Sequence, residues 1–449
     1  MKKLTNFPYS NALVLGLAKS GTAAARLLLQ NGVNVRVNDK KSDKQDEEIR
    51  ELQTMGAEVI TGSHPLSVLD GIDLIVKNPG IPYDNPLLIE AEKRRLPVIT
   101  EIELAGRMVE SSIIGITGSN GKTTTTTLVT EMLRRSGQPV EVAGNIGFVA
   151  SEVAQTLKED EKMVLELSSF QLMGVQSFKP KIAVLLNIFE AHLDYHKTFE
   201  NYKNAKSNIF ANQDADDFLV YNADDPVVCD AVQKAASQKV PFSLQKRLEN
   251  GAWADGSNIY FKSEPIASRD AIALVGDHNL ENILAAMCVA KLSGATNNGI
   301  RQVLSSFTGV KHRTQFVDRI NGRLFYNDSK ATNILATQKA LASFRQPVIL
   351  LAGGLDRGNE FDELLPYLNY VKGMVLFGET AGKLEKVAEQ AGISFVTCAE
   401  TMNEAVTIAY RQSAEGDVVL LSPACASWDQ YRTFEQRGDM FIQAVHTLK

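Results

Sequence analysis

The chain has 449 residues, 44% of them hydrophobic and 22% charged, which excludes intrinsic disorder and leaves room for about three domains at roughly 150 residues each. A formal net charge of −6 argues against a nucleic-acid binder, since such proteins usually carry a basic patch. No apolar run approaches the ~18 residues of a membrane span and the cysteines form no CxxC pair, so we expect a cytoplasmic protein without disulfides or a zinc site.

The first part of the chain alternates between strand and helix patterns, as α/β layers do. Gly16 and Gly21 fit the nucleotide-binding pattern G-x-G-x-x-G, but the middle position is Ala18. Asp39 ends the second strand, where such folds hold a ribose-binding acid. A dinucleotide site, another nucleotide ligand and a structural βαβ unit all fit, although the alanine disfavours a pyrophosphate pressed against the backbone. A strand-like run opens this part at Ala12, further strands are expected at 33–37 and 74–76, and a helix is expected at 22–30.

The second part opens on a phosphate-binding loop. An apolar stretch at 112–116 leads into Gly115-Ile116-Thr117-Gly118-Ser119-Asn120-Gly121-Lys122-Thr123-Thr124, and a helix pattern follows at 125–136. The strict P-loop pattern needs glycine at 116, whereas the glycines here stand at 115, 118 and 121. Glycines let backbone N–H groups approach a phosphate, Lys122 can reach the β- and γ-phosphates, and Thr123 or Thr124 can reach Mg²⁺. The loop predicts binding of a nucleoside triphosphate; the alternative is a glycine turn before an ordinary helix.

Further polar residues follow buried strands of this part, expected at 163–167, 182–186 and 218–221. Glu166 stands at the end of the first of these, where α/β sheets place metal ligands, although a lone glutamate there is often a solvated strand end. His192 and Asp194 follow the second strand, so His192 is a candidate ligand of a second Mg²⁺ or a substrate contact, or else a structural histidine.

Two helical stretches are less distinctive. Lys206, in the stretch 202–207, has the pattern of a surface lysine. Asn279 and Asn282 stand three residues apart on one helix face, where amides can hold an adenine or a phosphate or simply cap the helix. The third part begins near residue 323 and has expected strands at 323–326, 348–351, 374–377, 395–397 and 418–421.

Taken together, the motifs resemble the Mur ligases, the ATP-dependent amino-acid ligases of peptidoglycan precursor synthesis. The resemblance covers nearly the whole chain and is carried by several motifs in order: the Gly-Lys-Thr-Thr loop, Glu166-Leu-Ser-Ser-Phe-Gln171, His192-Leu-Asp194, His278-Asn279 with Asn282, His312-Arg313, Asn327-Asp328-Ser329-Lys330-Ala331-Thr332-Asn333, and Leu421-Ser-Pro-Ala-Cys-Ala-Ser427 with Phe434-Glu-Gln-Arg-Gly438. The last of these is the most specific.

The resemblance implies an α/β protein of three domains. They are an N-terminal Rossmann-like domain (1–100) that binds the UDP substrate, a central P-loop ATPase domain (101–309), and a mobile C-terminal Rossmann-like domain (310–449) that brings the amino acid. The implied substrates are UDP-N-acetylmuramoyl-L-alanine, D-glutamate and ATP with Mg²⁺, with no nucleic-acid partner and no membrane insertion, in a monomer. A carboxylate would attack the γ-phosphorus of ATP to give an acyl phosphate, which the glutamate amine would then displace.

The resemblance also assigns site residues. ATP would be held by Gly118, Asn120, Gly121, Lys122, Thr123, Thr124, Asn279, Asn282, Arg313, Asp328 and Lys330. The UDP substrate would contact Lys19, Ser20, Asp39, Lys40, Asn78, Asn145 and Gln171. The glutamate would meet Thr332, Arg357, Ser427 and Phe434, and magnesium would be bound by Thr123, Glu166, His192 and a carbamylated Lys206. Lys122, Glu166, His192 and Lys206 would be the catalytic set.

Several alternatives stay open at this point. A Mur ligase that adds L-alanine would share the first domain and the P-loop, but the Ser422–Ser427 run and Arg357, a cation suited to a second carboxylate, favour glutamate. Related enzymes often have lysine at position 357, so the arginine is a departure. Three further alternatives are less favoured. A folate-polyglutamating ligase would lack the UDP-type first domain, and an NAD-linked oxidoreductase would not need a P-loop. A non-catalytic nucleotide-binding regulator would not need the set Glu166, His192 and Lys206.

Overall fold

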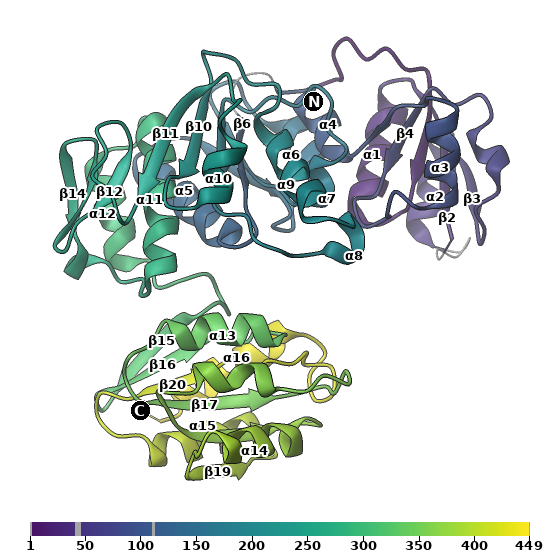
Figure 1. The fold of residues 1–449 in the computed structure, drawn as a ribbon. Coiled ribbons are helices and arrows are strands. Elements are labelled where there is room, and N and C mark those ends of the chain that lie inside the picture. Colours follow the sequence, from purple (N-terminus) through teal and green to yellow (C-terminus); the bar gives the residue numbers. More distant parts are fainter. Residues whose placement is uncertain (1, 41–45, 110–112, 449) are drawn as a thin grey trace. The chain divides into compact units, whose positions relative to one another are not determined.

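The computed structural model describes residues 2–40, 46–109 and 113–448. Sheets flanked by helices follow one another along these ranges (Figure 1), which confirms the expected three-domain α/β class. The chain divides into two compact units, Met1–Ile272 with Leu280–Ser305, and Ala273–Asn279 with Ser306–Lys449. The first unit contains two of the sheets and the second unit contains the third. None of the helices in the described ranges has the length and apolar content needed to cross a bilayer.

The first sheet is parallel, with the order β3-β2-β1-β4-β5. Its central strand is fully buried, as the continuous run of apolar residues predicts for a parallel sheet covered on both faces. Helix α1 begins three residues earlier than predicted and includes Gly21, a poor helix former. Glycine is needed there because a Cβ would lie 1.9 Å from the carbonyl oxygen of Gly16. The elements are β1 (Asn11–Leu15), α1 (Lys19–Gln30), β2 (Asn34–Asp39), α2 (Glu47–Thr54), β3 (Glu58–Thr61), β4 (Leu74–Lys77), α3 (Pro86–Lys93), β5 (Val98–Ile99) and α4 (Glu101–Gly106).

The central sheet has the order β14-β13-β12-β11-β10-β9-β6-β8-β7 and is parallel from β7 to β12. The expected first strand begins at Ile113, and the predicted Ser112 lies outside the described residues. Helix α5 begins at Lys122, not at the predicted 125, because the phosphate loop starts the helix directly although its β-branched threonines have low helix propensity. The elements are β6 (Ile113–Thr117), α5 (Lys122–Arg135), β7 (Val140–Gly144), α6 (Ala150–Thr156), β8 (Lys162–Glu166), α7 (Ser169–Leu172), β9 (Ile182–Leu185), α8 (Leu193–His196), α9 (Phe199–Ser207), β10 (Phe218–Asn222), α10 (Pro226–Ala231), β11 (Gln238–Ser243), β12 (Ala252–Ala254), β13 (Asn258–Phe261), β14 (Glu264–Ser268), α11 (Asp277–Leu292) and α12 (Asn297–Ser306).

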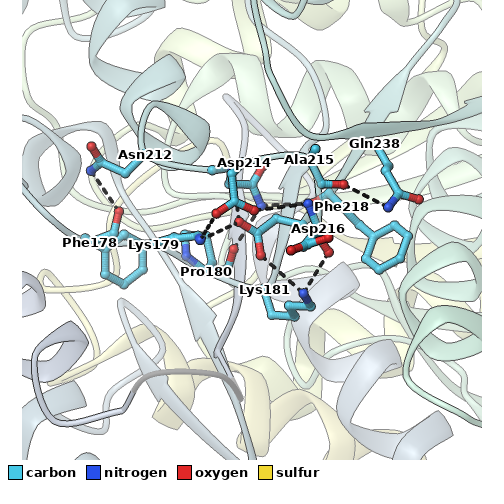
Figure 2. Close-up of polar contacts among 12 residues, drawn as sticks. Phe178, Lys179, Pro180, Lys181, Asn212, Asp214, Ala215, Asp216, Phe218 and Gln238 are labelled. Atoms are coloured by element: carbon cyan, nitrogen blue, oxygen red, sulfur yellow. Dashed lines mark hydrogen bonds and ion pairs between the residues drawn. The ribbon is translucent and has the colours of Figure 1, made fainter.

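At the amino-terminal ends of the strands, polar contacts join residues that precede β9 and β10 with each other and with the first residue of β11 (Figure 2). Lys179 pairs with Asp214 at 2.5 Å, and Lys181 donates to the carbonyl oxygen of Asp216 at 2.7 Å. Gln238 donates to the carbonyl oxygen of Ala215 at 2.9 Å. These contacts lie at the end of the strands opposite to the phosphate loop.

The third sheet has the order β15-β16-β20-β17-β18-β19 and is parallel except for β15. Alternate residues of β17 face opposite cores, one formed with α13 and α14 and the other with α15 and α16. The predicted strand 418–421 matches β20, and the other predicted strands of this part lie within the observed ones. The elements are β15 (Gln315–Ile320), β16 (Arg323–Asn327), α13 (Ile334–Ala342), β17 (Val348–Gly353), β18 (Val371–Phe377), α14 (Ala381–Gln390), β19 (Phe395–Cys398), α15 (Met402–Gln412), β20 (Val418–Leu421) and α16 (Phe434–His446).

Candidate active site

The phosphate loop joins β6 to α5. The strand order of the central sheet reverses at this point, because β8 pairs with one side of β6 and β9 with the other. Gly121 precedes the helix with φ +83°, and a Cβ there would lie 2.2 Å from Oδ1 of Asn282. Only glycine fits both conditions. The loop thus presents the N-terminus of α5, whose N–H groups and dipole favour an anion, and the predicted Asn282 lies against it.

A residue that sequence reasoning missed holds this loop in place. Asn187 stands just after β9 and accepts two hydrogen bonds from the loop. The backbone N–H of Asn120 donates to Oδ1 of Asn187 at 2.8 Å, and the backbone N–H of Ser119 donates to the carbonyl oxygen of Asn187 at 2.9 Å. Ser119 Oγ also lies 3.0 Å from the hydroxyl of Tyr202 on α9. A lone amide after a strand has no sequence signal of its own, so only the fold reveals this role.

Two lysines meet at the loop. Lys122 Nζ donates to the carbonyl oxygens of Gly118 (2.8 Å) and Ser119 (3.1 Å), and Lys206 Nζ donates to the same oxygen of Gly118 at 2.8 Å. Lys206 is only 2% exposed, and within the described ranges no carboxylate pairs with it. Burial, followed by the charge of Lys122, holds the pKa of Lys206 well below its usual value. The interpretation of Lys206 as a surface lysine is therefore wrong.

Glu166 ends β8 at the same edge of the sheet. It is 2% exposed, and its Oε1 accepts a hydrogen bond from Nδ2 of Asn145 at 2.8 Å. Its Oε2 is buried and has no hydrogen-bond partner within the described ranges. A buried carboxylate oxygen without a partner is costly unless a cation meets it, so this atom fits a metal ligand.

His192 precedes α8 in a left-handed conformation (φ 55°), which is uncommon for a residue other than glycine. Its ring packs on Phe170, with the centroids 5.0 Å apart. Burial lowers its pKa, Asp194 opposes that shift, and the charges of Lys122 and Lys206 add to it, so the imidazole is neutral at pH 7, as a metal ligand must be. Among the described residues, however, no group of three or more His, Cys, Asp or Glu side chains is placed to hold a metal.

Four of the predicted UDP-substrate residues lie at the carboxyl ends of β1, β2 and β4, where the strand order of the first sheet reverses and such folds bind ligands. Asp39 Oδ2 accepts from the backbone N–H of Leu17 at 2.7 Å, and Nδ2 of Asn78 donates to Oγ of Ser20 at 3.2 Å. Lys19 begins α1 beside Ser20. The structure thus brings Lys19, Ser20, Asp39 and Asn78 to one edge.

Two other predicted UDP-substrate residues have local roles. The charge of Lys40 acts on His64, whose pKa is lowered first by burial and then by this lysine. Gln171 caps its own helix, since its Oε1 accepts from the backbone N–H and the hydroxyl of Ser168, both at 2.9 Å.

In the second unit, the predicted ATP residues gather after β16. Asp328 accepts from the backbone N–H of Thr314 at Oδ1 (3.0 Å) and from the hydroxyl of Ser422 at Oδ2 (2.9 Å), and burial raises its pKa to about 7. Nearby Arg313 opposes that shift. Lys330 Nζ lies 5.2 Å from the ring centre of Phe434. Asn279, in contrast, donates to the carbonyl oxygen of Val275 at 2.7 Å, which is the helix-capping alternative.

Three of the predicted glutamate residues lie on the loops that follow β16, β17 and β20, and the fourth, Phe434, begins α16. Thr332 follows β16, and the guanidinium of Arg357 lies 4.9 Å from the ring centre of the exposed Trp428. Ser427 is buried, and its Oγ has no hydrogen-bond partner in the described part of the chain. This orphaned hydroxyl is available to a ligand.

Arg437 is a second residue that sequence reasoning missed, although it stands in a quoted motif. It is fully buried, and its Nε donates to Oγ of Ser329 at 3.0 Å while Nη2 donates to the carbonyl oxygen of Cys425 at 3.0 Å. It thereby ties the loop after β16 to the loop after β20. Burial lowers its pKa to about 10, so it stays charged.

Comparisons with known proteins cover most of the chain. Family descriptions match as follows: the Mur ligase MurD-like, N-terminal domain at residues 10–100, the Mur ligase middle domain at 116–290, and the Mur ligase, glutamate ligase domain at 312–425. The chain is 61% identical over 449 residues to the UDP-N-acetylmuramoylalanine--D-glutamate ligase of Oceanobacillus iheyensis, with 100% of both chains covered. It is 57% identical over 451 residues to the enzyme of the same name from Geobacillus kaustophilus, again with 100% of both covered.

Solved structures share the fold. The MurF ligase from Thermotoga maritima in complex with ADP has a TM-score of 0.59 and 18% identity, covering 99% of this chain and 98% of its own. The UDP-N-acetylmuramate-alanine ligase MurC from the same organism has a TM-score of 0.57 and 18% identity, covering 98% and 100%.

Proposed function

The chain belongs to the Mur ligase family, and we infer that it joins D-glutamate to UDP-N-acetylmuramoyl-L-alanine in peptidoglycan synthesis. It is an ATP-dependent ligase that forms an amide bond. The observation that carries this conclusion is the 61% identity over the whole length of a relative with that name. The L-alanine-adding alternative is similar only in fold, at 18% identity.

We propose that the predicted site residues act as assigned. The N-terminus of α5, Lys122 and Asn282 would meet the ATP phosphates, and Glu166 with His192 would bind Mg²⁺. Two observations support the metal site: Oε2 of Glu166 has no hydrogen-bond partner in the described ranges, and the lowered pKa of His192 favours its neutral imidazole. The phosphate site is supported by the close approach of Gly121 to Asn282, which leaves no room for a Cβ. When bound, Mg²⁺ would neutralise charge on the phosphates.

We further propose that Lys206 is carbamylated. Its neutral amine would attack CO₂, forming an N–C bond and releasing one proton, and the product would be an anionic carbamate. The supporting observation is that Lys206 is buried beside Lys122, with no acid paired to it in the described ranges. The anionic carbamate would attract the ammonium group of Lys122. The carbamate would also give the metal a third ligand beside Glu166 and His192, since no third His, Cys, Asp or Glu is placed there among the described residues.

In the reaction, the carboxylate of the UDP substrate attacks the γ-phosphorus of ATP, and ADP leaves. Two anions meet in this step, so Lys122 at the loop would offset the charge on the transferring group. The amine of D-glutamate then attacks the acyl carbon, phosphate leaves and the amine loses its proton. Arg357 would hold a carboxylate of the glutamate, and the hydroxyl of Ser427 would donate to it.

The direct test is the product. Incubation with ATP, Mg²⁺, UDP-N-acetylmuramoyl-L-alanine and D-glutamate is expected to yield one glutamyl-extended nucleotide and one phosphate per amide formed, measured by mass spectrometry and phosphate release. Phosphate release without the extended nucleotide would instead indicate an ATPase.

Replacing Arg357 with alanine is expected to raise the KM for D-glutamate by about tenfold or more, because the carboxylate of a bound glutamate needs a cation or several donors. The KM values for ATP and the UDP substrate should stay nearly unchanged. Steady-state kinetics with each substrate varied in turn would measure this. Arg345→Ala is the matched control, since Arg345 also stands over an aromatic ring, that of Tyr370, at 5.8 Å. An unchanged KM for D-glutamate would remove Arg357 from the site.

We retain the domain limits 1–100, 101–309 and 310–449, a monomeric state and a cytoplasmic location as predictions. The first sheet ends at Ile99, and the third sheet begins at Gln315.

A further inference from the structure

Lys77, the last residue of β4, is a buried lysine with no part in the mechanism above. It is 1% exposed, and its Nζ donates to the carbonyl oxygens of Asn78 (3.3 Å) and Pro79 (3.3 Å) and to the hydroxyl oxygen of Tyr195 (3.1 Å). Within the described ranges, no carboxylate offsets its charge. The three protons of the ammonium group therefore meet neutral oxygens only.

Burying an ammonium group in this way is costly. Burial lowers the pKa of Lys77 to about 7, and the ring of Tyr83, whose centre lies 4.7 Å from Nζ, offsets part of the cost. An apolar side chain of similar length would fill the same space at lower cost. Burial also raises the pKa of Tyr195, so its hydroxyl stays protonated and can donate. The lysine thus points to a role beyond packing.

The contacts of Lys77 join two segments that are distant in sequence. The hydroxyl of Tyr195, on α8, lies 3.0 Å from the carbonyl oxygen of Pro79 and 2.9 Å from that of Ile81, so it fastens the loop 78–81. This loop carries Asn78, whose side chain bonds to Ser20 at the start of α1.

On the other side, the ring of Tyr195 packs on Phe170 with a centroid distance of 4.5 Å. Phe170 also packs on His192, which immediately precedes α8. A chain of direct contacts therefore runs from the loop of Asn78 through Lys77 and Tyr195 to His192.

We propose that Lys77 is a positioning residue of the ligase reaction, which with Tyr195 fixes the loop 78–81 against α8. The loop would hold the nucleotide end of the UDP substrate, and His192 would hold the metal near the reacting carboxylate of the same molecule. The two ends must therefore keep a fixed separation, and a misplacement of about 1 Å can cost a hundredfold in rate. This proposal rests on the proposed function for the roles of Asn78 and His192.

Lys77→Met keeps the length of the side chain and removes its charge and its donors. We expect the KM for the UDP substrate to rise about fivefold or more and kcat to fall about tenfold, with the KM for ATP within about twofold of wild type. A merely structural role predicts another result, because loss of folded protein lowers kcat and leaves both KM values unchanged. The matched control is Lys197→Met. Lys197 directly follows α8 and pairs at 2.9 Å with Asp84, which stands after the loop 78–81; both side chains are exposed, where an ion pair contributes little.

Tyr195→Phe removes one oxygen atom and tests the same contacts with little risk to folding. It should reproduce the effect, and the double variant should be no worse than the more impaired single one, since both act through shared contacts. Calorimetric titration with UDP alone needs no ligation and should show affinity about fivefold weaker in Lys77→Met. Unchanged UDP affinity and unchanged KM in both variants would overturn the role of Lys77. A wild type that binds UDP but forms no amide would overturn the proposed function, while the UDP titrations would still decide the role of Lys77.

Discussion

Replacing Lys122 with alanine is expected to lower the rate of ligation by at least about a hundredfold while the protein remains folded. Nζ of Lys122 lies within the phosphate loop, 2.8 Å from the carbonyl oxygen of Gly118, so it stands where the transferring phosphoryl group would develop charge. Removing one positioned donor from such a site costs about two to three orders of magnitude in kcat. The measurement is phosphate release at saturating substrates, with circular dichroism to verify folding.

The matched control is Lys179→Ala, which removes a lysine from the opposite edge of the same sheet. Its ion pairs with Asp214 and Asp217 lie away from the phosphate loop, so the rate of phosphate release at saturating substrates should stay at the wild-type value. Turnover of Lys122→Ala close to that of the wild type would contradict the placement of ATP at this loop.

Replacing Lys206 with alanine should leave almost no activity, and added acetate or formate should restore part of it. The reason is the proposed carbamate, because a free carboxylate can enter the space of the lost side chain and supply the missing anion at the metal. The rescue should saturate with carboxylate concentration. Isothermal titration with Mg²⁺ and an ATP analogue should show the same dependence without turnover.

Lys203→Ala is the control for this experiment. Lys203 stands on the same helix, α9, but pairs with Glu200 at 2.9 Å and Asp230 at 3.1 Å near the surface. It should behave like the wild type with or without carboxylate. Full activity of Lys206→Ala without any additive would mean that Lys206 only fills space, and a dead variant that no carboxylate rescues would argue against the carbamate.

The parts of the site that follow from local pattern could be predicted from the sequence. An apolar strand, a glycine turn and a helix start define the phosphate loop wherever they occur together, and Glu166 could be placed because it directly follows the buried residues of β8. The sequence predicts the start of α5 three residues too late, because threonine has low helix propensity, whereas the turn at Gly121 starts the helix directly.

Other features depend on contacts between distant segments, which no local pattern encodes. The helix that carries Lys206 has a polar composition typical of a solvated face, yet its packing against the phosphate loop buries this lysine. Asn187 and Arg437 act through hydrogen bonds to loops that are distant in the sequence, and Lys77 acts through a hydrogen bond to the distant hydroxyl of Tyr195. Their residue types are ordinary, and only the arrangement of the strands brings their partners within reach.

The choice of amino acid is the central claim, and phosphate release from ATP in the presence of UDP-N-acetylmuramoyl-L-alanine, with D-glutamate, L-glutamate and L-alanine supplied in turn, tests it most directly. The chain is expected to release phosphate rapidly with D-glutamate and only at background rates with L-glutamate and L-alanine. Rapid release with L-alanine and none with D-glutamate would contradict the assignment.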